Sequence, residues 1–191
     1  MGAVNNIFQS LLMGASQEMQ VLTKEKTEIK SKNQQFGLMP LLSKIDAEPY
    51  FSDKTKSFAI FKEDSLKLLP LIPDESIDMI FADPPYFLSN GGITCHAGKM
   101  VSVNKGKWDV SNGIEDSHIF NGRWLKECQR ILKPNGTIWV SGTSHIIHSI
   151  GFVMQSLHYK ILNDISWFKV NPPPNLSCRY FTHSTETIIW A

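Results

Sequence analysis

Short, nearly uninterrupted runs of apolar residues recur along the chain from residue 57 onward. Ile77 to Ala82 is such a run, broken only by Asp78, and Thr137 to Ser141 is another. Runs without polar alternation are typical of strands that are buried on both faces of a parallel sheet. Further strands are predicted at residues 58–61, 160–170 and 184–190.

The segments between these strands show helical spacing. Apolar residues recur every three or four positions over residues 120–132, and Lys-Pro-Asn-Gly at 133–136 ends that helix. A second helix is predicted at 145–158, and Asp64 or Ser65 is expected to cap a helical turn at 64–69. The alternation of strand and helix predicts an α/β fold, with a mostly parallel sheet and helices on both of its faces.

Two segments depart from this alternation. Residues 1–50 contain the polar stretch Gln17–Gln35, rich in Lys, Glu and Gln, which predicts an N-terminal arm or solvated helix ahead of a folded domain at 51–191. Residues 87–118 have no clear period and contain several Gly and Asn residues. Loops of this length in compact domains are usually functional or disordered.

Composition changes this picture in three ways. The net charge of +1 gives no whole-chain electrostatic argument for nucleic acid, so any such surface has to come from local clusters. No apolar run approaches the roughly 18 residues of a membrane helix, and no signal peptide is evident, which predicts a cytoplasmic protein with no membrane partner. No metal site is predicted, because the three cysteines form no CxxC pair and His145 and His148 have no third ligand in view.

The candidate chemistry lies where the first long strand ends, in the sequence IDMIFADPPY. In open parallel sheets, ligands bind beyond the carboxyl ends of strands. Pro84 and Pro85 lack N–H groups, so their carbonyls and the Asp83 carboxylate form a pocket of hydrogen-bond acceptors, whose natural partner is an exocyclic amine. Tyr86 offers a flat face on which a ring bearing that amine can stack. The alternative for an isolated Asp-Pro pair is a simple loop cap.

These residues resemble a known family. DPPY resembles the catalytic motif of S-adenosylmethionine-dependent DNA amino-methyltransferases, which flip the target base out of the duplex. The segments DSLKLLPLIPDESIDMIFADPPYFLSNGG, VSVNKGKWD, LKPNGTIWVSGT and NPPPNLSCRYFTHSTETIIWA are similar to the permuted, beta-group adenine-N6 methyltransferases of type II restriction-modification systems, above all those that methylate GATC. The resemblance implies a Rossmann-like methyltransferase fold, with residues 51–191 as the catalytic domain.

The resemblance also implies roles for individual residues. The implied catalytic and base-stacking residues are Asp83, Pro84, Pro85 and Tyr86; the implied cofactor-binding residues are Asp64, Ser65 and Asp83; the implied DNA-binding residues are Asn104, Lys105, Lys107, Trp108, Asn171 and Asn175. Each secondary group has a plainer alternative. Asp64 can be a helix cap, the lysines can belong to a solvated loop, and 171–175 can be a linker between two strands.

One family feature has no counterpart in this sequence. The permuted family places a recognition segment and then a glycine-rich FxGxG-type cofactor loop after the part matched here, and no such motif is present in the 191 residues. The chain is therefore expected to be an incomplete fold, completed by a homodimer partner or a complementing chain if it is active. The alternatives are a non-catalytic remnant that binds DNA or a partner subunit, and a cytosine-N4 methyltransferase. That subgroup more often has Ser in place of Asp83. Double-stranded DNA is the expected substrate, and single-stranded DNA is a second hypothesis because an unpaired base needs no flipping energy.

Overall fold

The structure is a computed structural model that describes residues 41–191, except 56 and 97. The chain divides into two compact units, Met1–Lys62 and Glu63–Ala191. The polar stretch Gln17–Gln35 lies outside the described residues, so the prediction of an N-terminal arm or helix stays a prediction. In the first unit, strand β1 (Phe51–Ser52) pairs antiparallel with β2 (Ala59–Ile60).

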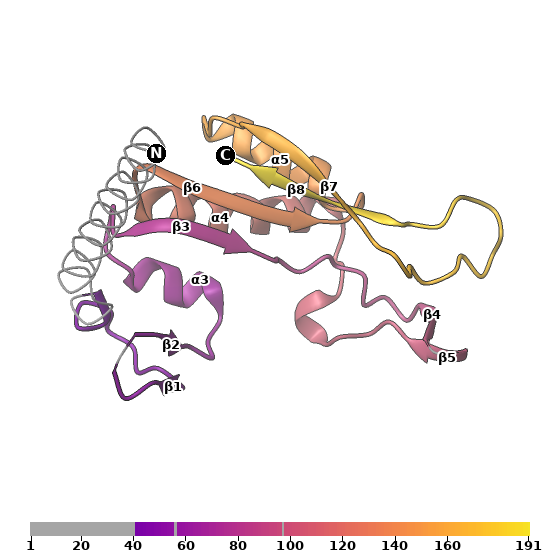
Figure 1. Ribbon diagram of the computed structural model, residues 1–191, viewed down its shortest axis with the longest axis horizontal. Helices are drawn as coiled ribbons and strands as arrows, with labels where there is room; N and C mark the ends of the chain where they lie inside the picture. The colour runs from indigo at the N-terminus through magenta and orange to yellow at the C-terminus, as the bar shows by residue number, and fades with distance from the viewer. Residues whose placement is uncertain (1–40, 56, 97) are drawn as a thin grey trace, which may run out of the picture. The chain divides into compact units, whose positions relative to one another are not determined.

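The second unit contains a four-stranded sheet in the order β3-β6-β8-β7 (Figure 1). Strand β3 (Ile77–Ala82) runs parallel to β6 (Leu132–Gly142). Strand β8 (Thr185–Trp190) runs antiparallel to both β6 and β7 (Asn163–Phe168). Three of the four strands therefore share one direction, as the α/β pattern predicts, and β8 makes the sheet mixed.

The helices of this unit pack against one side of the sheet. Helix α4 (Ile114–Ile131) and helix α5 (Ile147–Ser156) lie along this side (Figure 1). They contribute most of the core, together with inward-facing residues of β6 and β8. The short helix α3 (Ser65–Leu68) and the 3-10 turn η1 (Leu69–Leu71) pack against the same core through Leu66 and Leu69. Among the described residues, no helix covers the other side of the sheet.

Strand β3 has the predicted bounds, but the prediction that it is buried on both faces is wrong for the described residues. Ile80 and Ala82 pack against the core, whereas the alternating residues Met79 and Phe81 are each 60% exposed. Cross-strand pairs continue this exposed side over the sheet. We call it the open face and define it by Met79, Phe81, Trp139, Ile165, Trp167, Ile188 and Trp190. Trp139 and Trp190 stack on it with ring centroids 4.7 Å apart.

The segment after β3 is more structured than its sequence predicts. It contains an antiparallel hairpin of β4 (Ile93–His96) and β5 (Lys99–Ser102), then the 3-10 turn η2 (Lys107–Asp109). Helix α4 begins at residue 114 rather than at the predicted residue 120. The prediction missed its first turns because their apolar residues, Ile114 and Ile119, are about 60% exposed and form no inward-facing stripe. Residues 133–136 lie inside β6 as an irregularity, with Asn135 at φ 65°, instead of forming a loop.

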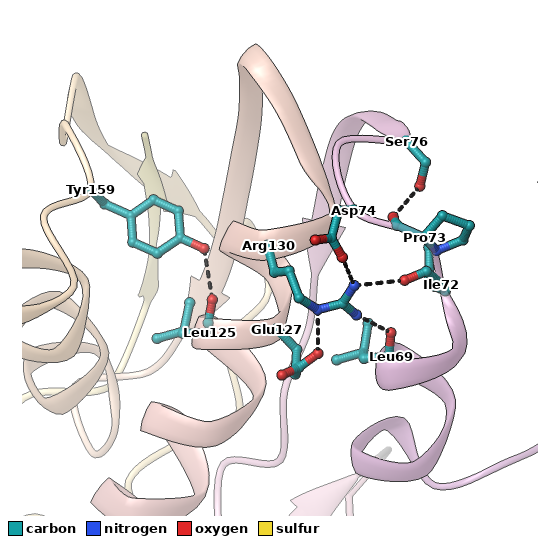
Figure 2. Close-up of polar contacts among 9 residues, drawn as sticks. All are labelled: Leu69, Ile72, Pro73, Asp74, Ser76, Leu125, Glu127, Arg130 and Tyr159. Atoms are coloured by element: carbon teal, nitrogen blue, oxygen red, sulfur yellow. Dashed lines mark hydrogen bonds and ion pairs between the residues drawn. The ribbon is translucent and has the colours of Figure 1, made fainter.

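A polar clasp holds the end of α4 to the segment that leads into β3 (Figure 2). The Arg130 guanidinium donates to the carbonyls of Leu69 and Ile72, each at 2.9 Å. It also pairs with Asp74 and, at 2.8 Å, with Glu127. The Leu69 carbonyl, which also accepts the Ile72 N–H at 3.1 Å, and the Ile72 carbonyl are thus paired with the guanidinium. These contacts tie the segment just before β3 to the C-terminal end of α4.

Candidate active site

Asp83 directly follows β3, at the carboxyl end of the strand, where the α/β pattern predicts ligand binding. Ser141, near the end of the neighbouring strand β6, donates a hydrogen bond to Oδ1 of Asp83 at 2.7 Å. The Tyr86 hydroxyl donates to the same oxygen at 2.7 Å. Among the described residues, Oδ2 receives no hydrogen bond. One carboxylate oxygen is therefore anchored and the other is available to a ligand.

The Tyr86 hydroxyl is held in its neutral form. Partial burial raises the pKa of Tyr86 well above its usual range, and the hydrogen bond to Asp83 adds to this shift. The Glu186 carboxylate lies 3.5 Å from the hydroxyl, and its negative charge raises the pKa of Tyr86 further. Glu186 itself pairs with Lys169. Tyr86 therefore remains a hydrogen-bond donor to Asp83 over the physiological pH range.

A cavity of about 250 Å³ opens beside the acceptor residues. Asp83, Pro84, Pro85 and Ser65 line it, and apolar side chains that include Leu69, Ile80, Phe120 and Trp124 line the remainder. Two of the residues predicted to bind a cofactor, Ser65 and Asp83, thus share one hollow. Asp64 does not line this cavity. Its Oδ1 caps α3 by accepting the Leu66 N–H at 2.9 Å, which is the plainer of its two predicted roles.

The predicted DNA-binding loop meets the predicted stacking ring. The Lys105 ammonium lies 5.3 Å from the centroid of the Tyr86 ring, a cation–π arrangement. Lys107 and Trp108 are exposed, and Trp108 packs beside Gly106, where a Cβ would come 2.7 Å from its indole nitrogen. The side chain of Asn104 accepts the Gly91 N–H at 3.0 Å, so it also shapes the loop.

The two asparagines of the 171–175 segment show no contact with this centre in the described structure. Asn175 donates to the Tyr180 carbonyl at 2.5 Å and accepts the Ser177 N–H at 3.1 Å, which organises the turn between β7 and β8. Asn171 is exposed. A role for either residue near a flipped base remains a prediction.

Sequence reasoning missed Ser141 and Asp109. Ser141 is 58 residues from Asp83 in the sequence. The two residues face each other only because β3 and β6 are paired, with Ala82 opposite Val140. Asp109 is fully buried beside the turn that carries Tyr86. Asp109 ends the family-like segment VSVNKGKWD, but the resemblance implied no role for it. Nothing in the described residues groups three or more His, Cys, Asp or Glu side chains as a metal site would require, and no helix described is long and apolar enough to cross a membrane.

Residues 77–191 match the family model N6_N4_Mtase, described as DNA methylase. The chain belongs to this DNA methylase family. It is 56% identical over 144 residues to the type II methyltransferase M2.LlaDCHI of Lactococcus lactis subsp. cremoris, and 54% identical to M2.DpnII of Streptococcus pneumoniae. Identity to M2.MboI of Moraxella bovis is 50%. Each alignment covers 75% of this chain and 53% of the relative, so the methylase chain spans about half the length of the curated relatives it matches.

The fold comparison agrees with this assignment. The solved structure of the PvuII DNA methyltransferase, described as cytosine-N4-specific, superimposes with a TM-score of 0.55 at 19% identity, over 76% of this chain and 52% of that one. At such an identity the likeness concerns the fold alone. It confirms the predicted α/β, Rossmann-like methyltransferase architecture for this member of the methylase family.

Proposed function

We propose that this chain forms the catalytic part of an S-adenosylmethionine-dependent DNA methyltransferase that modifies adenine N6, with GATC as its site in a type II restriction-modification system. The observation that carries the proposal is the Asp83 carboxylate, fixed at Oδ1 by Ser141 and Tyr86 and open at Oδ2. Family membership and the relatives named type II methyltransferases support it. The DNA substrate makes the cytoplasm the proposed location.

The residues present fit part of a cofactor site. The cavity beside Asp83 is mostly apolar, with polar groups at Ser65 and Asp83, which suits a purine ring and its ribose. S-adenosylmethionine, when bound, supplies an electrophilic methyl group on its sulfonium. Ser65 and Asp83 are the residues of this chain that would hold it, with Asp64 at the adjoining helix start.

The chemistry proposed for Asp83 concerns the amine. The lone pair of adenine N6 is delocalised into the ring, so the amine is a poor nucleophile. If its two N–H groups donate to Asp83 Oδ2 and to the Pro84 carbonyl, the nitrogen is drawn toward tetrahedral geometry. The positive charge that develops on it during attack then faces oxygen acceptors. The nitrogen would gain the methyl group as the S–C bond of the sulfonium breaks and the thioether leaves, and it would lose one proton, for which the Asp83 carboxylate hydrogen-bonded to it would be an acceptor.

The loop around Lys105 is placed to contact DNA. A base that stacks on Tyr86 comes close to the Lys105 ammonium, which lies over that ring. We propose that the Lys105 ammonium binds a phosphate of the nucleotide whose base stacks on Tyr86, and phosphate contacts of this kind position the strand without reading its sequence. Asn104, Lys107 and Trp108 belong to the same loop and are proposed to contribute to DNA binding, as are Asn171 and Asn175.

We further propose that a complementing polypeptide completes the enzyme. β3 is an edge strand of the described sheet, and its Met79 and Phe81 side chains are exposed on the open face. Exposed edges and contiguous apolar faces are usually covered in native proteins. The shared 144 residues are only 53% of each relative, so the family provides further polypeptide that is large enough to cover this face. A second copy of this chain is the competing partner.

The decisive experiment measures transfer of a labelled methyl group from S-adenosylmethionine to DNA. The chain is assayed alone and together with the remaining half of a matched relative, on duplex GATC, single-stranded GATC and a duplex in which GATC is scrambled. Label on adenine N6 of GATC only when the halves are mixed supports both proposals. Label on cytosine N4 contradicts the base assignment. Saturable DNA binding with no transfer from either preparation favours the non-catalytic remnant.

A further inference from the structure

Asp109 is a carboxylate with no exposed surface. A buried charge is costly unless hydrogen bonds compensate it. Its Oδ1 accepts the Phe87 N–H at 2.8 Å, and its Oδ2 accepts the Ser89 hydroxyl at 2.7 Å. Its backbone carbonyl also accepts the Ser89 N–H at 3.0 Å. All three donors belong to Phe87 and Ser89, which follow directly after the DPPY motif, so Asp109 holds the backbone at the end of this turn.

Phe87, whose N–H donates to Asp109, has an unusual backbone conformation. Phe87 follows Tyr86 and lies at φ 56°, in the left-handed region that a bulky residue seldom adopts. Its ring is packed edge-on against Phe120 of α4, with centroids 5.7 Å apart. A conformation of this kind persists only where its surroundings hold it. Three restraints act on Phe87 among the described residues: the bond from its N–H to Asp109, the contact of its ring with Phe120, and a hydrogen bond from the Asn90 side chain to its carbonyl at 3.3 Å.

A relay extends the grip to the DNA-binding loop. The Ser89 hydroxyl that donates to Asp109 also accepts the Lys105 N–H at 2.7 Å. Lys105 in turn lies over the Tyr86 ring. Asp109 therefore fixes, through Phe87, the backbone that aims Tyr86, and, through Ser89, the backbone that places the cation over the same ring.

We infer that Asp109 is a positioning residue for methyl transfer, which sets the orientation of Tyr86 and hence of the base held against Asp83. The inference rests on the proposed function but concerns a residue to which the resemblance gave no role. Asp109 does not contact the reacting atoms, because both of its oxygens are buried and engaged. Its effect is transmitted through the turn, where a displacement of about 1 Å would lower the rate on the order of a hundredfold.

The test compares Asp109→Ala, Asp109→Asn and Ser89→Ala in the preparation that shows methyl transfer, with Asp116→Asn as the control. Asp116 is an exposed aspartate in the first turn of α4. Asparagine keeps an oxygen acceptor for the Phe87 N–H and an amide donor for Ser89, whereas alanine keeps neither. We expect Asp109→Ala to lower kcat on the order of a hundredfold with KM for DNA nearly unchanged. We expect Asp109→Asn to recover most of the rate, and Asp116→Asn to match the parent.

A second readout separates this inference from the proposed function. Amide hydrogen exchange at Phe87, followed by NMR, should be slow in the parent and in Asp109→Asn and fast in Asp109→Ala. The Tyr86-dependent quenching of 2-aminopurine at the target position of DNA should change in the alanine variant alone, because the ring is reoriented there while the base remains bound. If the parent transfers no methyl group, the proposed function fails and these two readouts still decide the role of Asp109. Asparagine behaving like alanine, or alanine retaining kcat, overturns the inference. If Asp109→Ala does not fold, Ser89→Ala decides the inference. It should lower kcat by less than the hundredfold expected for Asp109→Ala, and an unchanged kcat overturns the inference.

Discussion

At the scale of single residues, the site depends on how one carboxylate is oriented. The two hydroxyls of Ser141 and Tyr86 donate to Oδ1 of Asp83 and leave Oδ2 to an incoming amine. Hydroxyl donors fix the rotation of the carboxylate without neutralising its charge, and two prolines on its other side supply no competing N–H group. A carboxylate held in this way can discriminate an amine from a carbonyl, because only the amine can donate.

The first prediction compares Asp83 with Ser141, which donates a hydrogen bond to it. Asp83→Ala should lower the single-turnover methyl-transfer rate by at least about a hundredfold, because the acceptor matters as charge develops on nitrogen. DNA affinity should change by less than about twofold, since the interaction is made mainly in the transition state. Ser141→Ala should cost only about tenfold, because Tyr86 still donates to Oδ1. Equal losses for the two variants would contradict this division of roles.

The second prediction separates the ring of Tyr86 from its hydroxyl. Tyr86→Ala should weaken binding of DNA carrying a flipped target base by about 1 to 3 kcal/mol, the usual value of one base–aromatic stack. Tyr86→Phe keeps the ring and should retain that affinity while losing the bond to Asp83. Titration with 2-aminopurine-labelled DNA measures both. An alanine variant that binds as tightly as the parent would show that the base stacks elsewhere.

At the scale of elements, the sequence predicts β3 residue for residue and places β6, β7, β8 and the core of α4 close to where they lie. It predicts them because apolar runs and helical spacing are local features of the sequence. It misses the first turns of α4, whose apolar residues are exposed, and it cannot show that Ser141 faces Asp83, because that contact depends on strand pairing. The role of Asp109 is not evident from the sequence alone, because its hydrogen bonds with Phe87 and Ser89 depend on how the long loop folds back on itself.

The third prediction tests the clasp at the end of α4 shown in Figure 2. Arg130→Met removes the donors to the Leu69 and Ile72 carbonyls and should lower the free energy of unfolding by about 2 kcal/mol. Arg130→Lys should recover less than half of this, because an ammonium cannot reproduce the planar fork. Arg123→Met, at an exposed position of the same helix, serves as the control and should cost less than about 0.5 kcal/mol. Urea denaturation of the three variants gives these values.

At the scale of the molecule, the described residues of the second unit pack one side of the sheet and leave the other open. The α/β class follows from the alternation of elements, but which side is covered does not, because Phe81 and Ile80 are equally apolar in the sequence and differ only in what lies against them. The packed side is closed by α4 and α5 around Leu125, Ile138 and Ile150, none of which has exposed surface. Stability of the described sheet therefore depends on this one core.

The last prediction uses two ionisable groups of that core. Burial raises the pKa of the Cys128 thiol from its ordinary 9.0 to about 12, and burial also raises the pKa of the Tyr159 hydroxyl, which donates to the Leu125 carbonyl at 2.8 Å. Both groups stay protonated in the folded chain at pH values where the unfolded chain has already lost the proton. Their contribution to stability is complete below pH 9 and is lost as the pH rises, starting with Cys128 and continuing with Tyr159 above its ordinary pKa of 10.0.

The measurement is the free energy of unfolding between pH 7 and 11. Below pH 9, the contribution of Cys128 to the free energy of unfolding should not change with pH. Above pH 9 it should fall by up to about 1.4 kcal/mol per pH unit, as the thiol loses its proton in the unfolded chain. In Cys128→Ala the overall stability is lower because a cavity forms, but the decline should begin about one pH unit higher, when the tyrosines take over. If parent and variant decline in parallel between pH 9 and 10, Cys128 is not held in the core that α4 forms with the sheet.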